Sequence, residues 1–165
     1  MDGTELLARL QERFGPAVRG AHADHGDHTL LVDLGALPDV LRFCRDDPAL
    51  GCDMLMDFTA VDYLMYPGRE DAPRFEVVYH LYSVPHNHRV RIKAGVDEDD
   101  PVVPTAAPLW PIANWLEREV WDMYGIRFEG HPDLRRLLLY EQFEGHPLRK
   151  DYPVSRRQPL IGPRN

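Results

Sequence analysis

The histidines of residues 22–28 are the side chains most suggestive of metal chemistry. His22, His25 and His28 alternate with two aspartates, so five potential ligands fall within seven residues. Imidazole and carboxylate groups at this density could gather zinc or nickel, as in a small metal-dependent hydrolase. Aspartate, glycine and histidine are also common in tight turns, and this segment lies at the tip of a predicted hairpin. We therefore predict a turn, and keep the hydrolase as a remote alternative.

A short sequence occurs twice in the C-terminal part of the chain. Residues 129–136 read EGHPDLRR, and residues 144–150 read EGHPLRK. Each copy has a glycine for an unusual backbone turn, a proline that fixes φ, then a leucine and two adjacent cations. The leucine could fill an apolar pocket while the cations meet carboxylates. The repeat predicts a segment that lies along a surface, and a catalytic pair of His131 and His146 is the less favoured alternative.

Other patterns typical of catalysis or cofactor binding are missing from the sequence. No nucleophile elbow, glycine-rich phosphate loop or dinucleotide fingerprint is present. Cys44 and Cys52 are too few for a four-thiolate iron–sulfur site, and their spacing fits no CxxC site or disulfide framework. His86 and His88 follow a predicted strand, where a polar turn is the simpler interpretation. We predict no catalytic, cofactor-binding or metal-binding residue in this chain.

Helices and strands must position these residues, and the apolar pattern predicts both. Helical spacing of apolar side chains predicts helices over residues 4–14, 37–45 and 112–124. Alternation of apolar and polar side chains predicts strands over residues 17–23, 29–34, 54–65, 74–84 and 89–96. This order predicts an α+β domain of two layers, with a largely antiparallel or mixed sheet.

The predicted α+β domain covers residues 1–126, and an irregular C-terminal tail follows it. We call residues 127–165 the tail. They show no sustained period and are interrupted by five prolines. About forty residues without regular structure are uncommon in a compact domain unless they have a use. We expect the tail to be extended and to pack on a partner subunit.

The third predicted helix carries charges that bear on the tail. Its apolar face on a helical wheel consists of Ile112, Leu116, Val120, Met123 and Tyr124. Trp121 falls on the polar side with Glu117 and Arg118, and exposed tryptophans often mark interfaces. Glu119 falls at the edge of the apolar face, where a carboxylate needs a cation. We expect Glu119 to pair with a tail arginine such as Arg135; the alternative is a solvated Glu119.

Composition and charge limit the classes of function. A chain of 165 residues with 44% hydrophobic residues can form one domain with its own core. The net charge of −8 disfavours a general binder of nucleic acid or anionic lipid. Residues 130–165 carry seven basic and four acidic residues, whereas residues 1–129 carry 12 and 23. This basic segment is therefore expected to lie on an acidic surface of the same chain or of a partner.

We expect neither a signal peptide nor a membrane-spanning segment. The N-terminus lacks a basic start followed by an apolar run. The longest uncharged stretch, residues 102–116, is too short to span a bilayer and is broken by three prolines. The sequence therefore predicts a soluble protein, or one that sits on a membrane complex without entering the lipid.

Residues 117–153 resemble one protein family closely. The segments EREVWDMYGI (117–126), GHPDLRR (130–136) and GHPLRKDYP (145–153), with Phe128 between the first two, carry the resemblance. They are similar to the thirty-kilodalton subunit of respiratory complex I, which in bacteria is the C subunit of NADH–quinone oxidoreductase. The resemblance implies a non-catalytic structural subunit of the peripheral arm of a proton-pumping enzyme.

The family also implies partners and a location. The tail would run along a forty-nine-kilodalton-type subunit near the quinone site. FMN, iron–sulfur clusters and quinone would belong to partner subunits, and this chain would hold no cofactor. The complex would lie on the cytoplasmic face of the inner membrane. On this basis we assign partner contact or tail locking to Glu117, Arg118, Glu119, Trp121, Asp122, His131, Arg135, Arg136, His146, Arg149 and Lys150.

Two further alternatives stay open at this point. One is the equivalent subunit of an energy-converting hydrogenase, or of a ferredoxin- or deazaflavin-dependent dehydrogenase. The other is a free-standing binding module.

Overall fold

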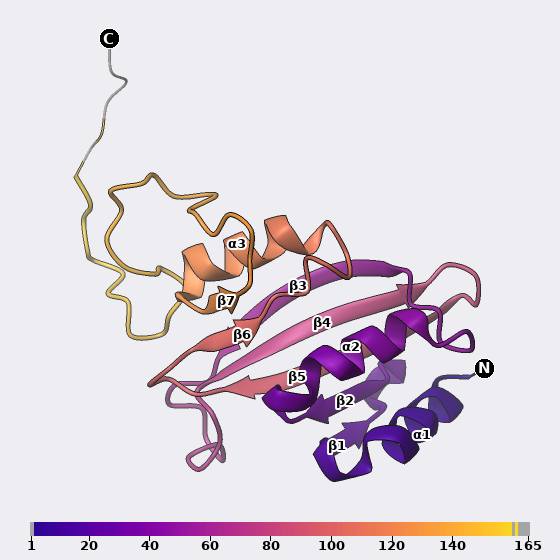
Figure 1. Cartoon of the computed structure of the whole chain (residues 1–165). Helices are drawn as coiled ribbons and strands as arrows, with labels where there is room; N and C mark the ends of the chain where they lie inside the picture. The colour runs from indigo at the N-terminus through magenta and orange to yellow at the C-terminus, as the bar shows by residue number, and fades with distance from the viewer. Residues whose placement is uncertain (1, 160, 162–165) are drawn as a thin grey trace.

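The computed structural model describes residues 2–159 and 161, which form helices, strands and a long irregular segment (Figure 1). The α-helices within these residues are α1 (Gly3–Phe14), α2 (Leu37–Asp46) and α3 (Ala113–Tyr124). The strands are β1 (Val18–His22), β2 (Thr29–Val32), β3 (Met54–Asp62), β4 (Phe75–Ser83), β5 (His88–Val96), β6 (Val102–Pro104) and β7 (Arg127–Glu129). Every predicted helix and strand is present, with ends shifted by a few residues.

The main sheet has five strands in the order β1-β2-β5-β4-β3. β2 pairs with β5 in parallel, and the other neighbours are antiparallel. The predicted α+β class with a mixed sheet is therefore confirmed. Helix α2 and the β3–β4 hairpin lie between β2 and β5 in the chain, which gives this parallel pair the long crossover it needs.

A second, small sheet was not predicted. β6 and β7 pair in parallel, with Val103 opposite Phe128. Each strand has three residues, which is too short for a visible alternation. Because β7 begins at Arg127, the predicted boundary after residue 126 falls between α3 and β7, and the first tail residues belong to regular structure.

The core lies on one face of the main sheet. Alternate residues of β4 and β5, such as Tyr79 and Ile92, point to this face and are fully buried. They belong to one cluster with Leu10 of α1, Leu41 of α2 and Val120 of α3. The sheet and the helices therefore form the predicted two layers around a single apolar core.

The ends of the helices follow local sequence signals. Asp2 caps α1, because its carboxylate accepts hydrogen bonds from the backbone N–H groups of Thr4 and Glu5. Gly125 ends α3 in the left-handed conformation, with φ of 76°, which glycine adopts without strain. This end of α3 is where the tail returns to the domain (Figure 1).

Candidate partner interface at the third helix and the tail

Helix α3 buries charged side chains against the tail and against the loop after β6. Glu117 and Asp122 are fully buried, and Arg118 is 6% exposed. The helical wheel had placed Glu117 and Arg118 on a solvated face, so this part of the prediction is wrong. Apolar packing does not explain their burial, because the partners of these groups are polar atoms of other segments.

The predicted apolar face of α3 is only partly correct. Val120 and Met123 are buried, whereas Ile112 precedes the helix and is 48% exposed. Trp121, predicted to face outward, is half-buried and packs against the core. The exposed tryptophan is Trp115, at 54%, with the guanidinium of Arg118 over its ring.

Asp122 is the centre of the contact between α3 and the tail. One carboxylate oxygen accepts hydrogen bonds from the successive backbone N–H groups of Leu137, Leu138 and Leu139, at 2.8–3.0 Å. The other oxygen accepts from the guanidinium of Arg136 at 2.7 Å. Burial opposes ionisation of Asp122, but these donors outweigh it and hold its pKa below the ordinary value. The tail backbone is thus fixed by a charged side chain.

Two arginines, Arg118 of α3 and Arg136 of the tail, add hydrogen bonds to carbonyl groups of the tail. Arg118 of α3 donates to the carbonyl groups of Arg135 and Arg136, each at 3.1 Å. Arg136 also donates to the carbonyl groups of Phe143 and Gly145. Backbone carbonyls in an irregular segment need donors when they are covered, and the two guanidinium groups supply them.

The second Gly-His-Pro copy caps the C-terminus of α3. Nδ1 of His146 donates to the carbonyl of Asp122 at 3.0 Å, and the backbone N–H of Leu148 donates to that of Met123 at 3.1 Å. Nε of Arg149 donates to the carbonyl of Tyr124. The last carbonyls of a helix have no partner within the helix, and they favour a nearby cation. Burial lowers the pKa of His146, so its imidazole is neutral at pH 7.

A partly buried ion cluster holds the end of the second copy. Arg74 forms ion pairs with Asp62, at 2.8 Å, and with Asp151, at 2.8 Å. Asp62 also accepts from the backbone N–H of Lys150 at 2.8 Å. Although burial opposes its ionisation, Arg74 and the backbone donors lower the pKa of Asp62. The sequence prediction missed Asp62 and Arg74, because their tail partners Lys150 and Asp151 lie far along the chain and no local pattern links them.

The predicted pairing of Glu119 with the tail is wrong. Glu119 is exposed, and it forms no ion pair within the part of the chain that the structure describes. Arg135, its expected partner, pairs with Asp133 on the surface. Helix and tail are nevertheless joined by an ion pair, which Asp122 and Arg136 form instead. The alternative prediction, that the Glu119 side chain is solvated, is correct.

Leucine side chains remain on the outer surface of the tail. Leu138 is 62% exposed and Leu148 is 50% exposed, and Leu137 and Leu139 are half-buried. Of the neighbouring leucines, only Leu134 packs against the core within the described residues. The polar groups of the tail thus point inward to α3, while several apolar groups point outward. This arrangement suits contact with an apolar surface.

The predicted turn joins β1 and β2, with His25 inside it, His22 at the end of β1 and His28 just before β2. His25 and Gly26 have positive φ within it. His22 lies 3.0 Å from Asp24, whereas the ring of His28 packs closely against Gly3 of α1. Among residues 2–159 and 161, no group of three or more histidine, cysteine or acidic side chains could hold a metal ion.

The other candidate residues, His86, His88 and the two cysteines, have structural roles. His86 and His88 bind the carbonyl groups of Pro48 and Leu50, which ties the β4–β5 turn to the loop after α2. Cys44 and Cys52 are free and buried, and burial raises the pKa of the Cys52 thiol to about 12. Neither pair has the thiolate or the oriented base that nucleophilic chemistry requires.

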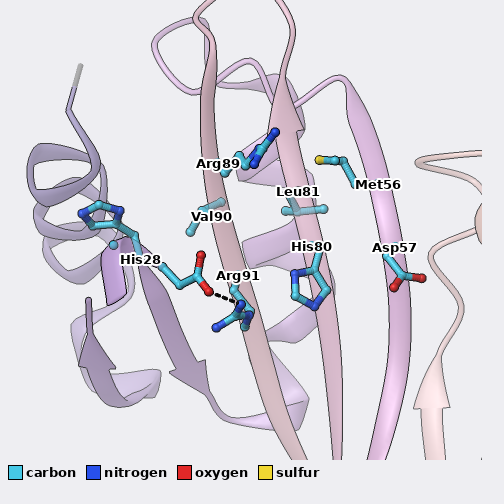
Figure 2. Close-up of a pocket in the computed structure, with 10 residues that line it drawn as sticks. His28, Met56, Asp57, His80, Leu81, Arg89, Val90 and Arg91 are labelled. Carbon is cyan, nitrogen blue, oxygen red and sulfur yellow. Dashed lines mark hydrogen bonds and ion pairs between the residues drawn. The ribbon is translucent and has the colours of Figure 1, made fainter. Parts of the chain in front are cut away.

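A cavity of about 360 Å³ lies on the sheet face away from the helices (Figure 2). Its walls include His80 of β4 and Arg91 of β5, which face each other across the strand pair. Arg91 is held by Asp27 at 2.7 Å. Burial, together with Arg91, lowers the pKa of His80, so its imidazole is neutral at pH 7. Asp57 and Arg89 also line the cavity and form no ion pair among the described residues, and the lining contains no serine, threonine, cysteine or lysine.

Comparison with known proteins finds relatives over most of the chain. The family model described as "Respiratory-chain NADH dehydrogenase, 30 Kd subunit" matches residues 30–158. The C subunit of NADH-quinone oxidoreductase from Roseiflexus castenholzii is 49% identical, over 94% of this chain and 86% of its own length. That of Caulobacter vibrioides is 47% identical, over 93% and 75%.

Two solved structures have a similar fold. One is described as the trypsin-resistant fragment (1–134) of Nqo5, with a TM-score of 0.71 and 34% identity over 81% of this chain and all of that one. The other is a chain of the membrane-bound sulfane sulfur reductase, an archaeal respiratory membrane complex. It has a TM-score of 0.73 and 24% identity, over 93% of this chain and 86% of that chain. The second likeness concerns the fold alone.

Proposed function

The chain belongs to the thirty-kilodalton subunit family of the respiratory-chain NADH dehydrogenase, and from this we propose that its tail docks it on a neighbouring subunit. As the C subunit of a complex I-type complex, it has partner subunits. We propose that it is a structural subunit of the peripheral arm and carries no catalytic centre itself. The observation that carries the proposal is the tail, whose backbone is fixed from inside while its leucines face outward.

The chemistry of the tail indicates what the partner offers. The guanidinium groups of Arg118, Arg136 and Arg149 are occupied by atoms of this chain, so they serve to hold the tail. The exposed Leu138 and Leu148 are then available for an apolar surface of the partner. Lys150, whose side chain is exposed, remains a candidate contact for an acidic group. The partner surface is therefore apolar at its centre, with carboxylates at its edge.

We identify this partner with the forty-nine-kilodalton-type subunit near the quinone site. The family relationship supports this choice. The resemblance rests on residues 117–153, which include most of the tail that we propose to dock, and the family implies this partner for the tail. FMN, iron–sulfur clusters and quinone would be held by partner subunits, and the complex would lie on the cytoplasmic face of the membrane. No helix in the described part of the chain is long and apolar enough to cross a membrane.

A second candidate is the equivalent subunit of a different respiratory membrane complex. It is favoured by the fold shared with a chain of the archaeal sulfane sulfur reductase. The identities of 47–49% to subunits of NADH-quinone oxidoreductase favour the first candidate. Measuring which donor reduces quinone in the purified complex distinguishes the two: NADH is expected, and oxidation of ferredoxin without NADH would support the second.

Substitution of an outward leucine tests the docking. Leu138→Asp should block incorporation of the subunit into the complex, because a carboxylate would be buried against an apolar partner surface without a cation. Incorporation is measured by co-purification with the complex and by its NADH–quinone reductase activity. The thermal unfolding of the isolated variant should match that of the wild type, because Leu138 contributes nothing to the core.

Val84→Asp is the matched control. Val84 has a similar exposed fraction, 59%, but lies at the β4–β5 turn and not in the tail. We expect the Val84 variant to assemble normally. Normal assembly of the Leu138 variant, or equal loss in both variants, would contradict docking through the tail.

A further inference from the structure

Glu117 is a buried carboxyl group that the proposed docking does not use. Its side chain is fully buried in α3. One oxygen accepts a hydrogen bond from the hydroxyl of Thr105 at 2.5 Å, and the other from the backbone N–H of Ala106 at 2.6 Å. Both donors belong to the loop after β6. A carboxylate at this depth would usually need a cation, because two neutral donors replace water only in part.

The first turn of the tail covers this carboxyl group. The backbone N–H of Thr105 donates to the carbonyl of Glu129 at 2.9 Å, so the Thr105 loop is tied to the end of β7. Gly130 follows with φ of 79°, and a Cβ there would lie 3.3 Å from the side chain of Thr105. Residues 129–131 therefore lie directly over the group that donates to Glu117. Opening of this turn would admit water to the carboxyl group.

The same turn supplies the nearest potential cation. Nε2 of His131 lies 3.9 Å from Glu117, and the His131 side chain is fully buried. That nitrogen donates to the carbonyl of Asn114 at 3.0 Å, while Nδ1 accepts from the backbone N–H of Asp133. Both ring nitrogens are thus used as in a neutral imidazole. His131 is held beside Glu117 without needing to carry a charge.

The other groups that face Glu117 do not compensate its charge. From β4, the hydroxyl of Tyr79 is buried and has no hydrogen-bond partner among the described residues. The neighbouring Arg118 turns away, because its donors bind the carbonyl groups of Arg135 and Arg136. Within residues 2–159 and 161, no arginine or lysine forms an ion pair with Glu117. An ionised Glu117 would therefore remain an uncompensated buried charge.

We propose that Glu117 positions the first turn of the tail, residues 129–131, and that ionisation of its carboxyl group loosens this turn. While the carboxyl group is protonated, it sits in the apolar site without cost from charge, and the turn stays closed over it. When it ionises, the state in which the turn opens and water reaches the carboxylate becomes more favourable. This inference rests on contacts within the chain and not on the docking of the tail.

The direction with pH follows from the site. Burial raises the pKa of Glu117 to about 7, and the bonds from Thr105 and Ala106 oppose this only in part. In the opened turn the pKa would return toward the value of an exposed glutamate. The closed turn is therefore favoured at low pH and loses stability as the pH rises through about 7. From pH 6 to pH 8.5, linkage allows the opening equilibrium to increase about tenfold.

Hydrogen exchange of the full-length chain measures this opening directly. The amides of Thr105, Ala106 and His131 report on the turn, since each donates within it or to Glu117. Protection factors, corrected for the intrinsic rate at each pH, should fall about tenfold between pH 6 and pH 8.5. Amides of β4 serve as the internal reference and should not change.

Glu117→Gln keeps the shape of the side chain and removes its ionisation. Its protection factors should be independent of pH and should exceed those of the wild type at both pH 6 and pH 8.5, because the opened wild-type turn is already ionised at pH 6. Glu119→Gln is the matched control, because Glu119 is an exposed residue of the same helix. It should retain the tenfold change of the wild type.

Two results would overturn the inference. The first is unchanged protection of the turn amides in the wild-type protein from pH 6 to pH 8.5. This measurement needs no variant. The second is an unchanged pH dependence in Glu117→Gln, which would assign the dependence to another group such as His131. Either result leaves the docking proposal intact, because the Leu138→Asp test does not depend on pH.

Discussion

The domain and the tail hold their backbones in different ways. In the domain, alternate residues of the strands bury apolar side chains such as Tyr79 and Ile92, and the backbone is paired in the sheet. In the tail, three successive N–H groups are held by Asp122, and carbonyl groups are held by Arg118 and Arg136. Apolar burial fixes the first region, and buried charges fix the second.

This difference explains how an irregular segment can present apolar side chains. In the domain, a leucine that stabilises the fold is buried in the core, so it cannot contact a partner. In the tail, the folding is done by polar contacts to α3, so Leu138 and Leu148 stay exposed. The tail can thus have a defined path and still offer an apolar surface, as the proposed docking requires.

Removal of the Asp122 carboxylate should give the largest difference in stability between the tail and the domain. Asp122→Ala would leave Arg136 and three backbone N–H groups without their acceptor. Breaking a buried ion pair costs about 3–5 kcal/mol, and here the loss should appear as local opening of the tail. Hydrogen exchange should show the amides of residues 137–139 unprotected, while the β4 and β5 amides stay protected.

A core variant gives the opposite pattern and serves as the control. Ile92→Ala should cost about 2–5 kcal/mol of the global free energy of unfolding, because it leaves a cavity in the sheet core. It should weaken protection of the domain and the tail together. If Asp122→Ala also lowered protection across the whole domain, the division between the two regions would be wrong.

Acid should release the tail before the domain unfolds. The pKa values of Asp62 and Asp122 lie below the ordinary value of 3.8, so their ionised forms stabilise the folded tail. That stability is fully present above pH 3.8 and is lost as the pH falls through the lowered pKa values. Exchange measured stepwise from pH 5 downward should show residues 137–139 opening first. Simultaneous opening of β4 would contradict this order.

Substitution of the exposed charges should have the smallest effect. Glu119→Ala and Arg135→Ala should each change the free energy of unfolding by about 0.5 kcal/mol or less, since both side chains are exposed. Chemical denaturation measures this change. If either variant lost several kcal/mol of unfolding free energy, the result would support the ion pair of Glu119 with Arg135 that the structure contradicts.

The sequence predicts the domain better than the tail for a physical reason. The helices and long strands repeat apolar residues with a period, and that period is visible without knowledge of the fold. β6 and β7 have three residues each and show no period. The path of the tail depends on single contacts such as Asp122 with residues 137–139, and no local pattern encodes them.

The helical wheel failed on α3 because it treats every charge as solvated. Glu117 and Asp122 are buried by segments about 12 to 17 residues away, the loop after β6 and the tail. The clue available in the sequence is their position beside Val120 and Met123, which are core residues. The resemblance to the thirty-kilodalton subunit family rests on this same stretch, and the structure shows that Glu117 and Asp122 are the charges that face inward.

Photo-crosslinking from residue 138 in the assembled complex tests the central claim most directly. A crosslinking amino acid placed at Leu138 should form a covalent product with another subunit, and mass spectrometry should map it to an apolar surface. The same amino acid at Val84, which has a similar exposed fraction, should give no product with that surface. A Leu138 probe that reacts only within its own chain, or with solvent, would contradict docking through the tail.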